Sequence, residues 1–218
     1  MTARAGMTRP ESQRPPAAPA PDSMHELLTA LGSGAPAPGG GAAASLCGAL
    51  AAALVAMVCR VTAERDPSTA SEVSPSMARA DELWQRLASL VTDDMDAYRR
   101  VVDARRSGGG PEAVQPALTR ATEVPLMLAR GSREVLALCE SVAARARASA
   151  LSDLGVAAAL AGGALESGVL TARANLADAT DARFARASED ELAVLLAEGR
   201  EARQRVLETI ASRTRRRD

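Results

Sequence analysis

Residues 42–59 read AAASLCGALAAALVAMVC, eighteen residues in a row without a charged side chain. Alanine, the strongest helix former, dominates its first half. A helix that is apolar on every side lies either in a membrane or at the centre of a helical protein. We favour the protein interior, because small side chains let other helices approach closely and no basic cluster precedes the stretch. The segment therefore predicts a central, buried helix of a bundle.

The composition extends this interpretation to the whole chain. Of its 218 residues 47% are apolar, which is enough for a core, and only 1% are aromatic. Scarce aromatic residues argue against a β-sandwich or β-barrel and against a surface that stacks nucleic-acid bases. We predict an all-α helical bundle whose small-residue helices also pack between subunits, giving a homodimer.

Residues 1–22 differ from the rest in being rich in Pro, Ala and Arg without an apolar run. A signal peptide needs an apolar core of about 7–15 residues, so none is indicated. We expect a disordered tail here and a helical domain over 23–218. Ser23 and Glu26 have the spacing of a capping box, which predicts a short helix after Ser23.

Glycine, proline and capping residues divide the remaining chain. The predicted segments are a polar loop over 66–75 and helices over 76–106, 112–148, 154–176 and from 188 onward. Pro125 and Gly131 should kink or divide the second of these helices. Ser152 and Asp153 are placed to cap the third.

Thiol and imidazole groups are few. Cys47, Cys59 and Cys139 are an odd number without paired spacing, so we expect reduced thiols, which suit the cytoplasm, in the role of small core residues. His25 is the single histidine. This argues against a zinc site of the His/Cys type and against a Ser-His-Asp mechanism, and we expect no metal.

Asp94 is the carboxylate that does not fit its surroundings. The apolar row of residues 83, 87, 90, 94, 97 and 101 passes through it, as does a second row with Trp84 and Tyr98. Asp93 and Asp96 fall on a polar row instead. A buried carboxylate needs a partner or has a raised pKa, the usual setting of a general acid or base. A structural Asp at the edge of the row is the alternative that the pattern leaves open.

Two further features carry candidate binding groups. The loop GAPAPGGG at 34–41 opens the central helix, and helix N-termini with glycines bind anions through backbone N–H groups. The loop lacks the Lys and Ser/Thr of a P-loop, so a plain loop-to-helix turn is the alternative. Glu166 interrupts an uncharged run over 154–172, and either forms a structural ion pair or lines a site.

Together these stretches resemble the cyclodeaminase/cyclohydrolase family, which comprises the C-terminal domain of formiminotransferase-cyclodeaminase and stand-alone bacterial relatives. The similarity begins in the run that includes the glycine loop and the central helix. It continues through DMDAY at 94–98, the family's DxxAY/F, ATEVPLMLA at 121–129, SDLGVAAAL at 152–160, ESG at 166–168 and NL at 175–176. The order of these motifs is specific, and the likeness spans roughly residues 24–185.

The resemblance implies an all-α, dimeric enzyme for folate-bound one-carbon units. Such enzymes convert 5-formiminotetrahydrofolate to 5,10-methenyltetrahydrofolate and ammonia, or hydrolyse the methenyl form to 10-formyltetrahydrofolate. The family's active-site Asp falls on Asp94. The candidate substrate-binding residues are Pro38, Gly39, Gly40, Gly41, Arg65, Tyr98, Asp153, Glu166 and Asn175. The chemistry needs no metal or redox cofactor, and the expected partners are the folate and a second copy, with no nucleic acid and no membrane.

The glutamate carboxylates of a folate would suit the N-terminus of the central helix and an Arg such as Arg65. Two departures from the family leave the substrate open: TAER stands at 62–65 where relatives often have Thr-x-Gly-Lys, and Thr171 stands where Asn is frequent. The alternatives are a divergent enzyme for a non-folate amidine or cyclic substrate of a biosynthetic pathway, and a non-catalytic binding protein. Asp94 and the complete glycine loop argue against the second alternative.

Overall fold

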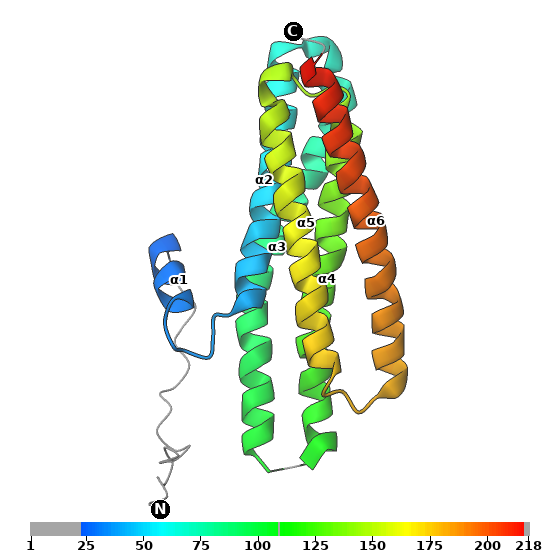
Figure 1. The fold of residues 1–218 in the computed structure, drawn as a ribbon. Helices are drawn as coiled ribbons and strands as arrows, with labels where there is room; N and C mark the ends of the chain where they lie inside the picture. Colours follow the sequence, from blue (N-terminus) through cyan, green and yellow to red (C-terminus); the bar gives the residue numbers. More distant parts are fainter. Residues whose placement is uncertain (1–22, 109, 216–218) are drawn as a thin grey trace, which may run out of the picture.

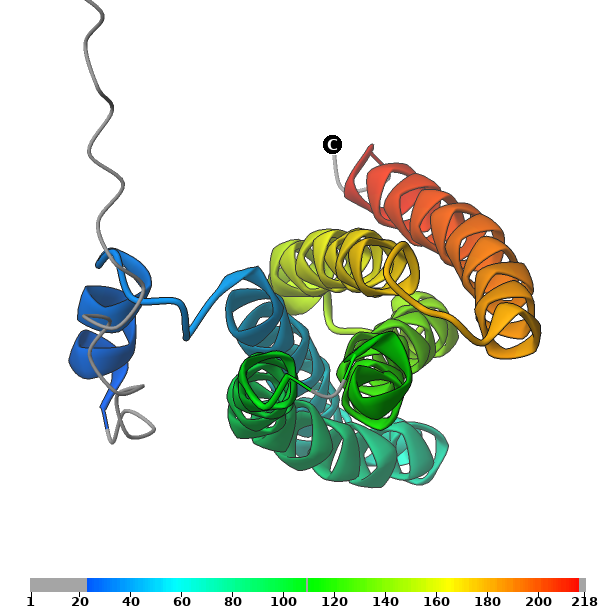
Figure 2. The same cartoon turned by 90° about the horizontal axis from the view of Figure 1, so that it is seen from below.

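The computed structural model describes residues 23–108 and 110–215, and these form helices without any strand. The helices are α1 (Met24–Leu31), α2 (Gly40–Arg65), α3 (Ala70–Arg106), α4 (Gly110–Ala143), α5 (Leu151–Leu176) and α6 (Ala182–Arg215). Helices α2 to α6 lie side by side in an elongated bundle, and α1 stands apart from it (Figures 1 and 2). The predicted all-α bundle is confirmed. The tail predicted for 1–22 lies outside the described residues.

The first helix and the long third helix show how local signals and packing compete. Ser23 and Glu26 form the predicted capping box at the start of α1. The polar loop predicted over 66–75 is wrong in its second half, because α3 already begins at Ala70. Val73 is only 1% exposed, so it ties this first turn to the core although Pro75 follows.

The predicted starts of α5 and α6 are also wrong. Helix α5 begins at Leu151 after a short 3-10 turn, without a side-chain cap from Ser152 or Asp153. Helix α6 begins at Ala182 rather than near 188. Asp181 provides its cap, because Oδ1 accepts hydrogen bonds from the backbone N–H groups of Arg183 and Phe184, both at 3.0 Å.

Pro125 does not divide α4, because a neighbouring helix supplies the hydrogen bond that proline removes. Proline has no N–H, so the carbonyl of Ala121, four residues earlier, lacks its helical donor. Nδ2 of Asn175 on α5 donates to this carbonyl at 2.6 Å. Gly168 permits the close approach, since a Cβ there would lie 2.9 Å from the carbonyl oxygen of Pro125. These contacts fix α5 against α4.

Helix α2 packs against α3, α4 and α5 through its small residues, as predicted for a central helix. Leu87 of α3 fills the space between these helices. A Cβ added to Gly131 of α4 would lie 2.8 Å from the Leu87 side chain, and one added to Gly48 of α2 would lie 3.5 Å from it. The two glycines therefore let three helices meet around one leucine.

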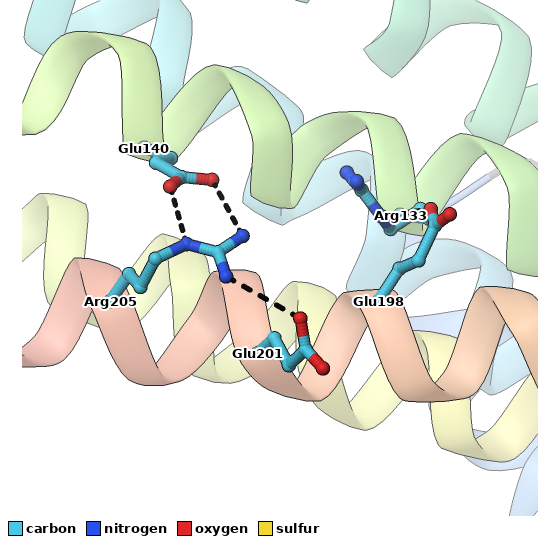
Figure 3. Close-up of polar contacts among 5 residues, drawn as sticks. All are labelled: Arg133, Glu140, Glu198, Glu201 and Arg205. Atoms are coloured by element: carbon cyan, nitrogen blue, oxygen red, sulfur yellow. Dashed lines mark hydrogen bonds and ion pairs between the residues drawn. The ribbon is translucent and has the colours of Figure 1, made fainter.

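Ion pairs line the contact between α6 and α4. Arg205 on α6 pairs with Glu140 on α4 at 2.6 Å and with Glu201, one turn earlier on α6, at 3.6 Å (Figure 3). Arg133 and Glu198 form another pair between the helices at 3.1 Å. Exposed ion pairs stabilise little, so the attachment of α6 rests mainly on its buried side chains, Leu192, Ala202 and Val206.

The three cysteines carry free thiols. Burial raises the pKa of Cys59 to about 11 and that of Cys139 to about 12, so both remain protonated at neutral pH. They serve as small core side chains, as predicted, whereas Cys47 is half-buried. Within residues 23–108 and 110–215, no three His, Cys, Asp or Glu side chains gather as a metal site.

Helices α2 and α5 expose apolar side chains on their outward sides. Their lengths and compositions would let either cross a membrane, yet 61% and 50% of the relevant stretches are buried among other helices. The exposed residues include Leu50, Val156 and Leu170, which are 45%, 50% and 69% exposed. The two helices pack against each other, and exposed apolar side chains on packed helices are of the kind that mark protein interfaces.

We predict that the chain is a homodimer that buries this surface. Leu170→Glu should shift the mass measured by light scattering from dimer to monomer, because an interface core does not accept an unpaired carboxylate. Val194→Glu is the control, since Val194 is 56% exposed on α6. A monomer mass for the unaltered chain at micromolar concentration would contradict the prediction.

Candidate active site

A cavity of about 330 Å³ lies where α2 begins, part-way along the bundle. Helices α2 and α3 are antiparallel and are joined by the short connection 66–69, but α2 has 26 residues and α3 has 37. The end of α3 therefore continues beyond the start of α2, beside α4 and the last turns of α5 (Figure 1). Ala97, Val101, Leu118, Ala121, Thr171 and Asn175 line the space between these three helices.

The glycine loop forms the part of the cavity next to α2. Pro36, Ala37 and Gly39 line it, together with Gly40 and Gly41 in the first turn of the helix. Pro38 is buried in the same loop, after a cis peptide bond, but is not a lining residue. Gly39 occupies the N-cap position and has no side chain to accept hydrogen bonds, so the N–H groups of the first turn need another partner.

Asp94 of α3 supplies this partner. Its carboxylate accepts a hydrogen bond from the backbone N–H of Ala42, so it caps a helix to which it does not belong. Gly41 makes the contact possible, because a Cβ at this position would lie 2.1 Å from Oδ1 of Asp94. Only glycine leaves room for the carboxylate at this turn.

The surroundings of Asp94 shift its proton affinity. Burial raises the pKa of the carboxyl above the ordinary value of aspartate, and the hydrogen bond from Ala42 opposes this effect only in part. The two neighbouring carboxylates are engaged elsewhere: Asp93 lies 3.7 Å from Arg120, and Asp96 lies 2.7 Å from Arg99. The inward position of Asp94 predicted from the helical pattern is confirmed, and its catalytic role stays a prediction.

Tyr98 and Asn175 also line the cavity, and their role in substrate binding stays a prediction. Tyr98 follows Asp94 by one turn and is 40% exposed, and Trp84 on the same row is 38% exposed. These two side chains thus lie at the edge of the α3 core face and not at its centre. Asn175 uses Nδ2 to bond Ala121, which leaves Oδ1 as the atom that can accept a hydrogen bond from a ligand.

Arg65, Asp153 and Glu166 do not line this cavity. Arg65 follows Gly41 by 24 residues, which puts it about 36 Å away along the axis of α2. Asp153 lies in the first turn of α5, whereas the cavity adjoins the last turns. Glu166 pairs with Arg200 of α6 at 3.3 Å, the structural alternative considered for it. The structure does not bring these three residues together with the glycine loop at this cavity, and a substrate-binding role for them stays a prediction.

Sequence reasoning missed Arg105 and Asp178 as cavity residues. Nη2 of Arg105 donates to Oδ2 of Asp178 at 2.5 Å, and both side chains line the cavity. Arg105 follows Val101 by four residues and therefore lies on the same face of α3 as Asp94. Extending the row beyond Val101 would have found it. Thr171, noted only as a departure from the family, also lines the cavity.

Comparison with known proteins places this architecture in a family. The family model described as "Formiminotransferase-cyclodeaminase" matches residues 23–194. A methenyltetrahydrofolate cyclohydrolase of Methylorubrum extorquens is 33% identical over 202 residues, covering 88% of this chain and 97% of the relative. The formimidoyltransferase-cyclodeaminase of Mus musculus is 32% identical over 208 residues, and this chain matches only 37% of its length.

A solved structure is similar over nearly the whole fold. The crystal structure of formiminotetrahydrofolate cyclodeaminase from Thermotoga maritima matches with a TM-score of 0.82 and 27% identity. The match covers 87% of this chain and 96% of the other. By its sequence over 23–194 and by its bundle of helices, the chain belongs to the formiminotransferase-cyclodeaminase family.

Proposed function

We propose that this chain is a folate-dependent enzyme that acts on the one-carbon unit between N5 and N10 of tetrahydrofolate. It either closes 5-formiminotetrahydrofolate to the 5,10-methenyl form with loss of ammonia, or hydrolyses the methenyl form to 10-formyltetrahydrofolate. The observation that carries the proposal is Asp94, a carboxylate of raised pKa held against the first turn of α2 inside a mostly apolar cavity. The likeness to a cyclohydrolase and to a cyclodeaminase supports the substrate class.

Both substrates are cationic at the carbon that reacts. A formimino group is an amidine, which is protonated at neutral pH, and the methenyl bridge is an amidinium cation. A carboxylate attracts such a cation more strongly in a cavity of low dielectric constant than in water. The bound cation in turn favours the ionised form of Asp94, which is the form that can accept a proton.

One carboxylate can serve both reactions. In ring closure, N10 bonds to the formimino carbon, Asp94 takes the proton from N10, and this proton passes to the nitrogen that leaves as ammonia. In hydrolysis, water bonds to the methenyl carbon and Asp94 takes one of its protons. N5 receives this proton as the bond between carbon and N5 breaks, and the remaining hydroxyl proton is released to solvent as the C=O bond of the formyl group forms. Neither reaction changes the oxidation state of the carbon, so no redox cofactor is required.

Incubating the protein separately with the two folates, while measuring methenyl absorbance and ammonia, tests the proposal. Methenyl formation with release of ammonia identifies a cyclodeaminase, and loss of methenyl absorbance above the uncatalysed rate identifies a cyclohydrolase. Turnover of neither folate by folded protein would contradict the proposal and favour a non-folate amidine or a binding role. Thr171 is the cavity residue at which this chain departs from the family, so it is where a different substrate preference would arise.

The first test of mechanism is Asp94→Asn. Asparagine keeps the shape of the side chain and can still accept the hydrogen bond from Ala42, but it cannot take a proton. We expect kcat to fall about 10²-fold or more, and folate affinity to fall by a smaller factor because the attraction to the cationic one-carbon unit is lost. The melting temperature should not fall, because the substitution removes a charge that burial disfavours. Steady-state kinetics and thermal unfolding measure the two effects.

Asp93→Asn and Asp96→Asn are the matched controls on the same helix. Both carboxylates lie at the surface beside arginines, so stability should stay within about 0.5 kcal/mol of the unaltered protein and turnover should not change. Wild-type turnover by Asp94→Asn would make Asp94 a structural residue and require another catalytic group.

The pH dependence gives an independent prediction. Asp94 must be ionised to accept a proton, and burial raises its pKa, so kcat/KM should rise with pH through a pKa above the ordinary range of aspartate. Below that pKa the carboxyl is protonated and activity is lost. The profile is measured after subtracting the uncatalysed rate at each pH. The same acid limb in the residual activity of Asp94→Asn would assign it to a different group.

Gly41→Ala tests the contact between Asp94 and α2. The new Cβ would lie 2.1 Å from Oδ1, so the carboxylate must turn away from Ala42. We expect a loss of turnover of about 10²-fold from this displacement, with helical content retained because alanine favours helix. Gly163→Ala on α5 is the control, since its Cβ meets nothing within 4 Å. Full activity of Gly41→Ala would show that catalysis does not depend on this contact.

A further inference from the structure

Four cavity residues follow one another along a single face of α3. Asp94, Tyr98, Val101 and Arg105 are separated by four, three and four residues, which places them in one line along the helix. The line runs from a carboxylate through an aromatic ring and an aliphatic side chain to a guanidinium. The rise of the helix puts its two ends about 16 Å apart.

Arg105 is the one basic side chain lining the cavity within the part of the chain that the structure describes. It also borders a second hollow of about 410 Å³, which shares Leu118 and Asp178 with the cavity and reaches the first turn of α4 at Pro111. The two hollows therefore meet at Arg105, and a ligand too long for the first can extend past the guanidinium.

The ion pair with Asp178 leaves Arg105 available to a ligand. The two side chains are 54% and 59% exposed, so water screens their attraction and the pair is weak. Breaking this weak pair costs little, so a carboxylate from a ligand that binds the guanidinium through two hydrogen bonds can take the place of Asp178. Asp178 meanwhile holds the guanidinium at the cavity when no ligand is bound.

The groups of a tetrahydrofolate follow one another in the same order as the residues of α3 that could bind them. With its one-carbon centre at Asp94, its p-aminobenzoyl ring lies along Tyr98 and Val101 and its glutamate extends toward Arg105. Long side chains on a helix lean toward its N-terminus, so the guanidinium of Arg105 reaches back toward Asp94 and shortens the span. A guanidinium can bind a carboxylate through two parallel hydrogen bonds.

The opposite orientation is disfavoured. The first turn of α2, which sequence reasoning assigned to the glutamate carboxylates, already holds the carboxylate of Asp94, and a second one there would be repelled. Arg65, the other group suggested for the glutamate, lies at the far end of α2.

We propose that Arg105 determines specificity for the glutamate end of the substrate, binding one of its carboxylates in exchange for Asp178. The inference rests on the proposed function, because it takes the substrate to be a folate. It adds the direction in which the substrate lies and the residue that holds its far end.

The test compares Arg105→Gln with the unaltered protein on two substrates. One is the folate that the unaltered protein turns over, 5,10-methenyltetrahydrofolate or 5-formiminotetrahydrofolate, and the other is its analogue in which a neutral amide replaces the glutamate. Arg105→Gln should raise KM for the folate about tenfold with kcat nearly unchanged, and should leave KM for the neutral analogue as it is. Arg106→Gln, a change at the next, exposed residue outside the cavity, should alter neither value.

The outcomes separate this inference from the proposed function. If the unaltered protein turns over neither 5,10-methenyltetrahydrofolate nor 5-formiminotetrahydrofolate, the proposed function fails, and calorimetric affinities for the methenyl folate and its neutral analogue then decide the role of Arg105. If Arg105→Gln still prefers the folate to the neutral analogue as strongly as the unaltered protein does, the assignment of Arg105 is overturned.

The variant Asp178→Asn tests separately whether the ligand carboxylate replaces Asp178 at Arg105. Removing this partner frees the guanidinium, so KM for the folate should stay constant or fall. A rise as large as that of Arg105→Gln would overturn the exchange, because the ion pair itself would then shape the cavity.

Discussion

The hydrogen bond between the carboxylate of Asp94 and the first turn of α2 is the constraint on which the site depends. A helix begins with N–H groups that need acceptors, and Gly39 at the N-cap offers no side chain. The acceptor comes from α3, so α2 has to begin beside Asp94. Helix α3 continues to Arg106, beyond the level at which α2 begins. The cavity lies beside these last turns of α3, in the space that α2 does not fill. The capping contact thus places the carboxylate and creates the room for a ligand together.

The position of Asp94 against α2 changes the pKa of its carboxyl in two opposite directions. Loss of water raises the pKa of Asp94, and the N–H of Ala42 stabilises the ionised form. Burial favours the neutral carboxyl, and a freely hydrated carboxylate is a weaker base than one of raised pKa. A carboxylate in this intermediate position can give back the proton that it takes, which both proposed reactions demand. Gly41 is essential to this balance because it lets the carboxylate reach the helix.

Sequence reasoning identified the face of α3 that carries Asp94, because helical periodicity states which side of a helix a residue occupies. Helical periodicity does not show where a residue lies along the axis of the bundle. Arg65 and Asp153 were therefore named as binding residues together with the glycine loop, although each lies at the end of its helix that is far from this loop. Sequence reasoning also expected Pro125 to kink or divide α4, whereas the helix is continuous through this residue. The compensating donor, Asn175, lies 54 residues from the carbonyl it serves, and no local pattern contains that information.

The motifs that carried the family resemblance divide into two kinds. Asp94 and the glycine loop line the cavity, whereas Pro125 and Gly168 contribute the close contact that fixes α5 against α4. Thr171 stands on α5 between Gly168 and Asn175, so the backbone is held on both sides of it. Its hydroxyl donates to the carbonyl of Ser167 at 3.0 Å, and its proton is therefore not offered to a ligand. A change at this position alters the lining of the cavity without moving the helix, which makes it a place where substrate preference can change while the chemistry of Asp94 is kept.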